Sequence, residues 1–594
     1  MIFFDFEVFK YDWMVVLMNM KNKTVTKIHN DSDALTRFYE EHKNDIWCGH
    51  NVVHYDQFIM KGIMLGMNPK TINDTIVVEQ IDGWRISGEF KKIPLILYDT
   101  MSSGRVGLKT YEGFLGSNIK ETDVDFNINR PLTPEEIDLT FQYCTHDVEQ
   151  TIEVFLRMTD EFNTMMFFIK HFNLPLSDLS LTKAQLAAKI LGGNHKGKKF
   201  DDEFQFPILD CIKLSKYKFV ADWYRNPENH NYEKSQEGVI IAGVPHTFSW
   251  GGGHGANKKI HLVGDFLIID VTAYYPSLQE RFKFGYRVMD NPENFEFIHN
   301  SNIEFKRKGD KKARQPFKIM DNAISGQMKQ YGSALFDPMS NNSICVNGQL
   351  LLLDLIEKLE PVIECLVQNN TDGIIIKLKD YDRDFDVIDG VVAEWEQRTG
   401  MKMDFETFFG EIYQKDVNNY VLIDKENGSM KVKGAYVKKL SPLDYDLPII
   451  NKALVGFFTN GIPVEKTINE CDDMIEFQKI VKLSKEYKHV EHEHCTPRVV
   501  TTGVKVKKQH YEYDITDRYS YKCYRVFASK DITDGRILKC GGKRGKPEKF
   551  ANTPDHAFIE NGDVTTMKCP DKLDRQWYID LAKDRLRQYG VDKK

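Results

Sequence analysis

The chain is predicted to be a multidomain α/β protein from its length, its alternating local pattern and its composition. Its 594 residues far exceed what one hydrophobic core organises, and at about 100 to 200 residues per domain they predict roughly three to five domains. Strand-like and helical patterns alternate through about residue 175, and a mostly helical stretch follows, which is typical of an α/β fold. Apolar residues make up 41% and charged residues 28%, the proportions of a globular protein.

The composition excludes several classes of protein. No apolar run approaches a membrane span, and acids at Asp5 and Glu7 make the apolar N-terminus a poor signal peptide, so a cytoplasmic protein without a membrane partner is expected. The ten cysteines form no C-x-x-C pair, which disfavours a zinc ribbon or a disulfide framework. The net charge of −7 does not by itself indicate a nucleic-acid binder, although seven cations and one acid crowd into residues 306–318.

Acidic residues near the N-terminus have spacings that bring their side chains together. Asp5 and Glu7 lie two apart in a predicted strand, so both project from one face. Tyr143 and Asp147 lie four apart in a predicted helix, again on one face, and Asp56 lies between these segments. Each fragment alone is typical of surface acids. Together they suit Mg²⁺ or Mn²⁺, and two such ions about 3.5 to 4 Å apart can activate water against a phosphodiester.

A second pair of carboxylates is predicted around a hairpin. The stretch "ECLVQNNTDGIIIKL", residues 364–378, has the pattern of strand, tight turn and strand with Asp372 at the tip. An ordinary β-turn is the alternative. The apolar strand predicted over residues 261–270 ends in Asp270, where its carboxylate can meet one from a neighbouring hairpin. We therefore expect Asp270 and Asp372 to be partners.

These segments together resemble the family B (alpha-like) DNA polymerases, and most closely the small phage members related to the protein-primed enzymes. D-x-E at Asp5, N-x-x-x-Y-D ending at Asp56 and Y-x-x-x-D ending at Asp147 are similar to the three exonuclease motifs. "DVTAYYPSLQ", "KIMDNAISG" and "QNNTDG" resemble the three polymerase motifs in order, and the resemblance covers roughly residues 1 to 440.

The resemblance implies a fold and a domain order. A ribonuclease H-like 3′–5′ exonuclease domain is expected over residues 1–175, and a helical linker with the first part of the polymerase module over 176–260. The palm is expected over 261–440 with fingers at about 295–345, and the thumb and C-terminal region over 441–594, which completes a right-hand polymerase. The implied activity is template-directed DNA synthesis with proofreading, in phage or viral DNA replication. If the protein is viral, its location is the host cytoplasm.

The resemblance also implies site residues, cofactors and partners. Two Mg²⁺ or Mn²⁺ ions are expected in each active site. The catalytic residues are Asp270 and Asp372 for synthesis and Asp5, Glu7, Asp56, Tyr143 and Asp147 for the exonuclease. The metal ligands are Asp270, Val271, Asp372, Asp5, Glu7 and Asp147. The incoming nucleotide is expected to contact Tyr275, Lys306, Arg314, Lys318 and Asn322. DNA is expected to contact His50, Asn51, Tyr55, Gly251, Gly252, Tyr420 and Lys433. The expected partners are primer–template DNA and deoxynucleoside triphosphates, with a priming protein or other replication proteins as candidates, and the chain is expected to be a monomer.

Several positions depart from the family pattern. Asn370 replaces the first acid of the third polymerase motif, Ser325 replaces a tyrosine of the second, and Asn418 replaces a lysine of the primer-holding motif. Ile128 stands where a catalytic lysine is expected before "NRP", and Pro316 predicts an interruption between Arg314 and Lys318. Asn370, Ser325 and Asn418 support an alternative function: a 3′–5′ exonuclease whose polymerase module has become a DNA-binding platform.

Two further segments carry local predictions. "SWGGGHG", residues 249–255, is predicted to be a loop that resembles the Y-x-G-G link between the exonuclease and polymerase modules, with Ser249 in place of tyrosine. "HVEHEHC" supplies His489, His492, His494 and Cys495. A zinc site is one interpretation of this segment, and a solvated acidic and histidine-rich loop is the other and is favoured, because the spacings fit no usual structural zinc pattern.

Overall fold

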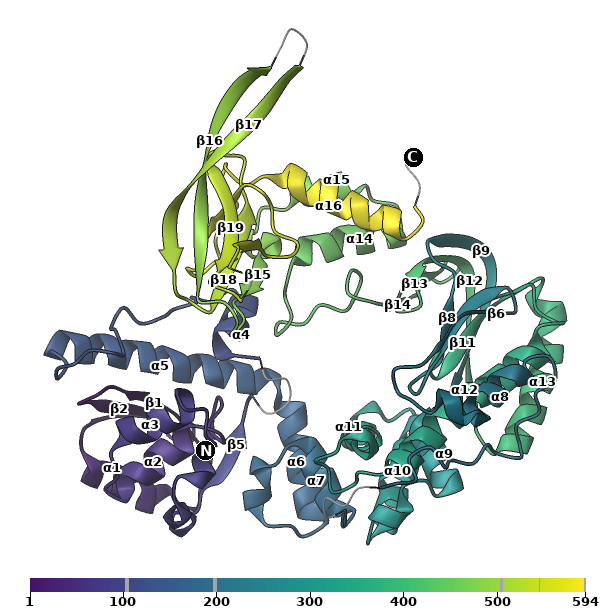
Figure 1. The fold of residues 1–594 in the computed structure, drawn as a ribbon, viewed down its shortest axis with the longest axis horizontal. Coiled ribbons are helices and arrows are strands. Elements are labelled where there is room, and N and C mark those ends of the chain that lie inside the picture. Colours follow the sequence, from purple (N-terminus) through teal and green to yellow (C-terminus); the bar gives the residue numbers. More distant parts are fainter. Residues whose placement is uncertain (102–105, 196–199, 503–505, 544, 592–594) are drawn as a thin grey trace. The chain divides into compact units, whose positions relative to one another are not determined.

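The computed structural model describes residues 1–101, 106–195, 200–502, 506–543 and 545–591 (Figure 1). The chain is a mixed α/β protein that divides into two compact units. Unit 1 comprises Met1–Thr182, Lys439–Lys452 and Glu465–Leu581, and unit 2 comprises Lys183–Lys438, Ala453–Val464 and Ala582–Lys594. The division falls inside three helices, α14 (Pro448–Asn460), α15 (Val464–Glu470) and α16 (Arg575–Gln588). The four-part domain order stays a prediction.

Unit 1 begins with a five-stranded mixed sheet. Its strands are β1 (Ile2–Val8), β2 (Trp13–Asn19), β3 (Thr24–His29), β4 (Ile46–Gly49) and β5 (Ile96–Asp99), in the spatial order β3-β2-β1-β4-β5. β1 is antiparallel to β2 and parallel to β4. The helices in this N-terminal part of unit 1 are α1 (Ser32–His42), α2 (Asp56–Met64), α3 (Pro69–Val77), α4 (Leu108–Leu115), α5 (Pro134–Arg157) and α6 (Thr159–His171).

The two faces of this sheet have different roles because side chains alternate along a strand. Phe4, Phe6 and Val8 of β1 join a large apolar core that includes residues of α1, α2 and α3. Phe3 lies on the opposite face and packs against Phe155 of α5, with ring centroids 5.4 Å apart. The acids of β1 share the face of Phe3, so they point toward α5.

The C-terminal part of unit 1 is mostly β structure. β15 (Lys479–Lys482), β18 (Cys523–Ala528) and β21 (Ala557–Ile559) form one sheet, and β17 (Val506–Tyr519), β16 (His489–Thr502), β19 (Asp534–Cys540) and β20 (Glu548–Lys549) form another, in that order. β16 and β17 pair as a long antiparallel hairpin (Figure 1). The favoured loop interpretation of "HVEHEHC" was therefore wrong: the segment is the start of β16, because its backbone pairs with both β17 and β19.

A buried arginine joins this β region to α4. Arg525 of β18 is fully buried and donates hydrogen bonds to the side-chain oxygen of Gln478 and to five backbone carbonyls. Those carbonyls belong to Glu112, Gly113, Ser117, Glu560 and Gly562. Three of them lie at or just beyond the C-terminal end of α4, where helix carbonyls lack internal partners and attract cations.

Unit 2 is built on a nine-stranded antiparallel sheet in the order β14-β13-β12-β9-β11-β10-β8-β7-β6. The strands are β6 (Gln236–Ile241), β7 (Val244–Phe248), β8 (His254–Ala256), β9 (Ile260–Val271), β10 (Cys365–Asn370), β11 (Gly373–Leu378), β12 (Met403–Asp416), β13 (Asn419–Asp424) and β14 (Met430–Lys433). The hairpin predicted over residues 364–378 is confirmed as β10 and β11.

One face of this sheet carries the main core of unit 2. Leu267, Ile269 and Val271 of β9 pack in a cluster with apolar residues of α8 (Lys218–Arg225), α9 (Tyr274–Phe282), α12 (Pro338–Leu359) and α13 (Tyr381–Thr399). Phe266 and Ile268 point to the other face, where they join a smaller apolar cluster. Asp270 continues the row of Phe266 and Ile268, so it lies on the face opposite these helices.

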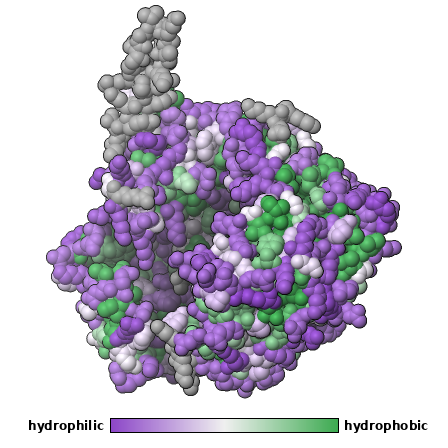
Figure 2. Space-filling view, turned by 45° about the vertical axis from the view of Figure 1, so that its right-hand side comes forward, coloured by the Kyte–Doolittle hydropathy of each residue, from purple (hydrophilic) through white to green (hydrophobic). Residues whose placement is uncertain are grey.

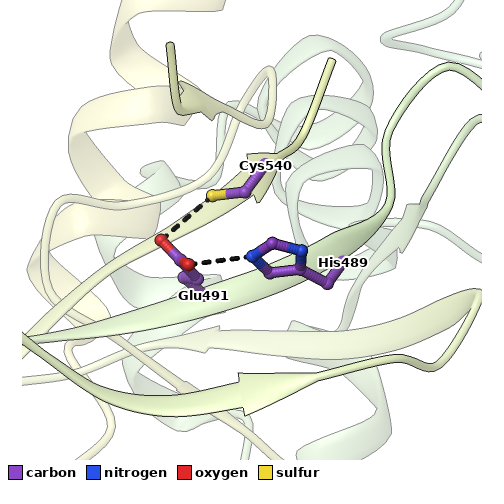
Figure 3. A group of neighbouring side chains, drawn as sticks. All are labelled: His489, Glu491 and Cys540. Atoms are coloured by element: carbon purple, nitrogen blue, oxygen red, sulfur yellow. Dashed lines mark hydrogen bonds and ion pairs between the residues drawn. The ribbon is translucent and has the colours of Figure 1, made fainter. Parts of the chain in front are cut away.

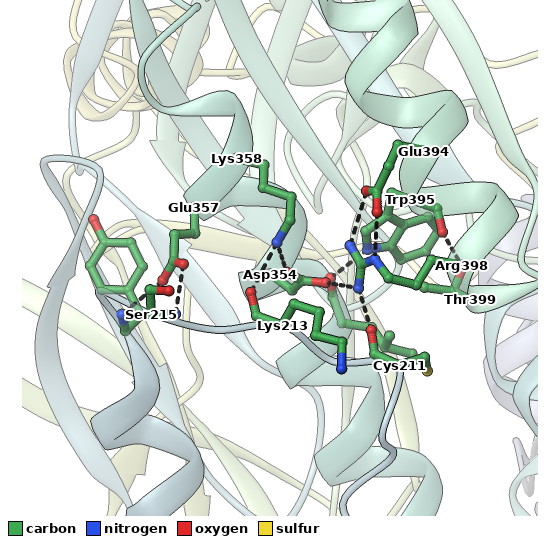
Figure 4. Close-up of polar contacts among 12 residues, drawn as sticks. Cys211, Lys213, Ser215, Asp354, Glu357, Lys358, Glu394, Trp395, Arg398 and Thr399 are labelled. Atoms are coloured by element: carbon green, nitrogen blue, oxygen red, sulfur yellow. Dashed lines mark hydrogen bonds and ion pairs between the residues drawn. The ribbon is translucent and has the colours of Figure 1, made fainter.

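Buried charges anchor the segment around residue 211 to α12 and α13 (Figure 4). Asp354 of α12 is fully buried and pairs with Lys358 and with Arg398, whose Nη1 lies 2.7 Å from Asp354 Oδ2. Arg398 also donates to the carbonyl of Cys211. Two backbone N–H groups, of Ser215 and Tyr217, donate to the carboxylate of Glu357 at 2.8 Å each. These contacts hold an irregular segment against the core helices.

Two antiparallel helices, α10 (Pro292–Arg307) and α11 (Lys311–Ser325), pack on each other, and α11 also packs on α7 (Lys183–Ile190). The interruption predicted at Pro316 was wrong, because α11 is continuous through it. Proline removes the bond that its N–H would have made to the carbonyl four residues earlier, and its ring crowds that carbonyl. The buried side chains of Phe317, Met320 and Ile324 keep the helix packed.

The loop predicted over residues 249–255 was wrong at its end. His254 and Gly255 belong to β8, which pairs with β10 and β7. A Cβ on Gly255 would lie 2.3 Å from the ring of His246, so glycine permits a close approach that any side chain would prevent.

No helix among the described residues is long and apolar enough to cross a lipid bilayer. On the face drawn in Figure 2, hydrophilic side chains predominate and apolar ones are exposed in smaller patches among them.

Candidate active sites

The first carboxylate cluster lies in unit 1, between β1 and α5. Asp5 and Glu7 project from the same face of β1, and the Sγ of Cys144 on α5 lies 3.8 Å from Asp5 Oδ2. Tyr143 and Asp147 lie one turn apart on the buried side of α5. α5 starts at a capping box between Thr133 and Glu136. The capping box fixes where the helix begins and therefore the positions of Tyr143 and Asp147 along the helix axis.

Asp56 completes the cluster from the N-terminus of α2. Its Oδ1 accepts a hydrogen bond from the backbone N–H of Phe6 at 3.1 Å, so the residue between Asp5 and Glu7 holds it in place. Burial raises the pKa of Asp56 to about 7. Burial, and then the charges of Asp56 and Asp147, raise the pKa of Asp5 well above its ordinary value.

The chemistry of this cluster fits a divalent metal. Burial, followed by the charges of Asp5 and Asp147, also raises the pKa of Glu7. Several buried carboxylates that disfavour one another's ionisation form a site that a cation stabilises. Carboxylate oxygens are the ligands that Mg²⁺ and Mn²⁺ prefer. Asp5, Glu7 and Asp147 are therefore suited to hold the two metal ions expected at this site.

A lysine that the sequence did not indicate lies in this cluster. Lys109 of α4 places its Nζ 2.6 Å from Asp147 Oδ1 and 3.0 Å from Glu112 Oε1, and 4.6 Å from the ring centre of Tyr143. Burial would lower the pKa of Lys109, but the charges of Asp147 and Glu112 outweigh it and raise the pKa. Ile128 stands where the resemblance places a catalytic lysine. It packs in an apolar cluster with Phe9, Met14, Val124 and Leu132.

Glu112 is the most buried acid beside this cluster. It is fully buried, burial raises its pKa to about 8, and its Oε2 has no hydrogen-bond partner among the described residues. The His146 Nε2 lies 3.7 Å from Glu112 Oε1. The only sequence signal for this group is the three-residue spacing of Lys109 and Glu112 on one helix face.

The predicted DNA-contacting residues of this unit are tied into its loops. The His50 ring nitrogens lie 2.9 Å from Thr100 Oγ1 and 3.0 Å from the carbonyl of Val106, so both are engaged within the protein. Asn51 has a left-handed backbone with a φ of 70°. Its N–H donates to Asp99. The Tyr55 hydroxyl donates to Asn73 Oδ1 at 2.7 Å. Their DNA contacts stay predictions.

The second cluster lies in unit 2, where β9 ends beside the β10–β11 turn. Asp270 is opposite Gly373 in the antiparallel pairing of β9 and β11. The N–H of Val271 donates to the carbonyl of Asp372 at 2.8 Å, which holds the turn against the strand end. Thr371 has a φ of 48°, so the tight turn is centred on Thr371 and Asp372. The two predicted partners are thus brought together.

Gly373 is required by the position of Asp270. A Cβ at Gly373 would lie 1.9 Å from Asp270 Oδ1 and 2.8 Å from the carbonyl oxygen of Ile269. No side chain fits there while Asp270 keeps this orientation.

Asn370 makes contacts that an acid could not make. Its side chain is buried, and its Nδ2 donates to the carbonyl of Val417 at 3.3 Å. The hydroxyl of Thr371 lies 3.4 Å from Asn370 Oδ1. An ionised carboxylate has no donor for the Val417 carbonyl, so an amide suits this position.

Two further acids and two lysines surround Asp270. Of these four residues, only Lys306 was predicted from the sequence. Asp404 of β12 pairs directly with Asp270 of β9, and Glu406 lies on the same face. The Lys431 Nζ lies 3.4 Å from Asp270 Oδ2 and 2.9 Å from Glu406 Oε1. Asp404 also accepts from Lys306 of α10 and from the Thr272 hydroxyl. The three missed residues are Asp404, Glu406 and Lys431.

The electrostatics of Asp270 are balanced by these neighbours. Burial raises the pKa of Asp270, the ammonium of Lys431 opposes that rise, and the charge of Asp372 adds to it. Paired acids at strand ends with a carbonyl beside them fit a hard divalent cation. Val271 is almost fully buried and its N–H is used, so only its carbonyl could serve as a ligand.

Two tyrosines predicted at this site lie near the acids. Burial, and then the neighbouring Cys345 and Asp372, raise the pKa of Tyr275. Burial, and then the charges of Asp270, Glu406 and Asp372, raise the pKa of Tyr420. Tyr420 pairs with Lys433 between β13 and β14, and Lys433 is exposed.

The other predicted contacts of unit 2 lie on α11 and on the glycine loop. Lys318 and Asn322 are exposed and four residues apart on α11, and Arg314 Nε donates to Asn302 Oδ1 at 2.9 Å. A Cβ on Gly252 would lie 2.8 Å from Thr371 Oγ1, whereas one on Gly251 would approach no atom closer than 3.9 Å. The loop therefore lies against the turn that carries Asp372.

The sequence matches no protein-family model and no curated protein. Among solved structures, the fold is similar to a family B DNA polymerase from the hyperthermophilic archaeon Pyrobaculum calidifontis. That similarity covers 100% of this chain and 78% of the polymerase, at 13% sequence identity and a TM-score of 0.38.

Proposed function

We propose that the protein is a template-directed DNA polymerase of the family B type, related to the small phage members, with a 3′–5′ proofreading exonuclease. The observation that carries the proposal is the presence of two separate carboxylate clusters, one in each compact unit, at the residues that resemble the family's motifs. Phage or viral DNA replication is the proposed setting, and the proposed location is the cytoplasm, of a host if the protein is viral.

The proposed exonuclease centre is the cluster of unit 1. Asp5, Glu7 and Asp147 would hold the metal ions, which when bound activate the attacking water and stabilise the leaving oxygen. Lys109 holds Asp147 through an ion pair at 2.6 Å and so acts as a positioning residue. Burial and the charge of Asp147 raise the pKa of Tyr143, so its phenol stays neutral and can donate a hydrogen bond.

The proposed polymerase centre is the cluster of unit 2. Asp270, the carbonyl of Val271 and Asp372 would hold two ions, which when bound lower the pKa of the primer 3′-hydroxyl and neutralise the triphosphate. Lys318 and Arg314 supply positive charge for the triphosphate. Lys431, which already pairs with Asp270 and Glu406, keeps the acids oriented. Tyr275 is proposed to pack against the sugar, and Tyr420 and Lys433 to hold the primer.

The finer architecture follows the same proposal. The five-stranded sheet of unit 1, with acids on its first strand and on the helix that crosses it, supports a ribonuclease H-like domain over 1–175. The nine-stranded sheet supports a palm within 261–440, and α10 with α11 supports fingers at about 295–345. Residues 176–260 are the proposed linker region, and 441–594 the proposed thumb and C-terminal region.

Primer extension and end degradation by the purified chain test the proposal. Asp270→Asn and Asp372→Asn are each expected to reduce nucleotide incorporation by more than about a thousandfold while degradation of single-stranded DNA continues. Asp5→Ala is expected to give the reverse pattern. Substantial incorporation by either palm variant would overturn the assignment of the polymerase centre.

The second candidate is an exonuclease with a degenerate DNA-binding polymerase module, and Asn370, Ser325 and Asn418 motivate it. A wild-type chain that degrades single-stranded ends with Mg²⁺ or Mn²⁺ but incorporates no nucleotide, under any primer tested, would establish this function. In that case Asp5→Ala would abolish the only activity.

A further inference from the structure

Three potential metal ligands meet at the base of the long β16–β17 hairpin in unit 1. His489 of β16 is directly opposite Cys540 of β19 in the antiparallel pairing, and Glu491 lies two residues further along β16. Residues two apart on a strand share a face, and directly opposed residues do too. The three side chains therefore converge on one side of the two strands (Figure 3).

The ligand atoms are close enough to bind one ion. The His489 Nε2 lies 2.8 Å from Glu491 Oε1, and the Cys540 Sγ lies 3.2 Å from Glu491 Oε2. All three ligand atoms lie within 4.8 Å of one another. Glu491 and Cys540 are buried, whereas the His489 side chain keeps 21% of its surface exposed. Solvent can therefore reach the group from the histidine side.

The donor set selects the class of metal. An imidazole nitrogen, a thiol sulfur and a carboxylate oxygen together suit Zn²⁺, which prefers a tetrahedral site with such ligands, and do not suit Mg²⁺ or Ca²⁺. A neutral imidazole, a carboxylate and a thiolate carry a net charge of −2, which one Zn²⁺ cancels. The carboxyl clusters of the candidate active sites are different, because they are rich in oxygen donors.

The protonated group is held together by hydrogen bonds in place of a metal. Burial, followed by the hydrogen bond and charge of Glu491, raises the pKa of Cys540 to about 12, so the thiol keeps its proton beside the carboxylate. Arg518 of β17 also lies on Glu491, with Nη2 2.9 Å from Oε1, but 65% of its side chain is exposed. It can turn into solvent when a cation takes its place.

We propose that His489, Glu491 and Cys540 bind one Zn²⁺, with a water molecule as the fourth ligand. On binding, the S–H bond of Cys540 breaks, its proton passes to solvent and a Zn–S bond forms, with no change in oxidation state. The ion fastens β16 to β19 and so anchors the base of the hairpin. The proposal is independent of the polymerase and exonuclease assignments.

The test uses the full chain, stripped of metal, with Co²⁺ as a spectroscopic probe. The expected result is a thiolate-to-cobalt charge-transfer band that saturates at one equivalent and disappears when Zn²⁺ is added. Cys540→Ser is expected to abolish the band, and His489→Ala to weaken binding by at least tenfold. His489 is partly exposed, so its replacement disturbs the fold least.

Two matched controls separate this site from other thiols. Cys495→Ser changes a buried cysteine of β16 that lies outside the group, and Cys144→Ser changes the thiol beside Asp5. Both are expected to keep the band. Absence of the band in the wild-type chain, its persistence in Cys540→Ser, or its loss in Cys144→Ser would each overturn the proposal.

Thermal unfolding provides a second readout that does not depend on cobalt. Zn²⁺ is expected to raise the Tm of the wild-type chain more than that of folded Cys540→Ser, because a ligand that binds only the folded state stabilises it and the carboxylate clusters of the candidate active sites are the same in both chains. An equal shift in both chains, or no shift in the wild type, would contradict the proposed role of the ion.

Discussion

The Lys109 ammonium lies 2.6 Å from a carboxylate oxygen of Asp147, and both belong to the acid cluster of unit 1. The same ammonium contacts Glu112 at 3.0 Å, so one lysine links a proposed metal ligand to a fully buried acid. Removing a group that orients a metal ligand typically costs tenfold to a hundredfold in activity.

Lys109→Met is therefore expected to slow exonuclease digestion of a 5′-labelled single strand by about 10-fold to 100-fold. Lys109→Arg keeps the charge and is expected to recover part of that loss. Incorporation of nucleotides is expected to stay unchanged. Lys120→Met is the matched control, because Lys120 is exposed. A full exonuclease rate in folded Lys109→Met would remove the lysine from the site.

Gly373→Ala is expected to reduce primer extension by at least about tenfold. The added methyl group would lie 1.9 Å from Asp270 Oδ1, so the carboxylate must turn away from residue 373 and leave its present position. Gly390→Ala is the control, because a Cβ at that position in α13 meets no atom within 4 Å. Steady-state incorporation rates measure the difference. Equal rates for the two variants would mean that Asp270 works in another orientation.

Asn370→Asp distinguishes a degenerate metal ligand from an amide that the fold requires. The carboxylate cannot donate to the Val417 carbonyl, and it places a charge in a buried position, so we expect a lower Tm and no gain in incorporation. Asn418→Asp, the same change at an exposed residue, should leave the Tm nearly unchanged. A rise in incorporation by Asn370→Asp would show that an acid at this position can serve as a metal ligand.

His246 is expected to make unit 2 sensitive to acid. It is buried in β7, and burial lowers its pKa to about 4, whereas an unfolded chain has a histidine pKa of about 6.5. Below pH 6.5 the unfolded chain binds a proton that the folded chain does not. The free energy of unfolding therefore falls as the pH is lowered, by roughly 3 kcal/mol once the pH reaches 4.

Denaturant titrations between pH 7.5 and pH 5 measure this loss. His246→Phe, which removes the titrating ring but keeps an aromatic side chain against Phe248, is expected to flatten the dependence. His261→Phe, at an exposed position of the same unit, should retain it. The same slope in wild type and His246→Phe would assign the acid sensitivity to other groups.

The sequence alone predicted those parts of the candidate sites whose residues lie close together along the chain. Alternation along β1 placed Asp5 and Glu7 on one face, helical spacing placed Tyr143 and Asp147 together, and the hairpin carrying Asp372 followed from its turn residues. The shared location of Asp270 and Asp372 followed from one strand end meeting one turn.

Residues brought in by distant pairing could not be predicted in the same way. Asp404 reaches Asp270 only through the register of β12 on β9, and Lys431 of β14 reaches it across β13 and β12. Register depends on the whole sheet and leaves no local pattern. The histidine-rich segment at residues 489–495 was misjudged for the same reason. It forms the start of β16 because its backbone pairs with two strands, β17 and β19, that lie more than ten residues away in the sequence.

The guanidinium of Arg525 gives the last third of the chain a part in the architecture of the first. Its donors satisfy carbonyls at the end of α4, the helix whose first turn carries Lys109. A fragment that stops near residue 175 would keep every acid of the first cluster but leave those carbonyls without their donor. The region up to about residue 175 is therefore not an independent folding unit, because its buried interior includes Arg525 from the C-terminal part of the chain.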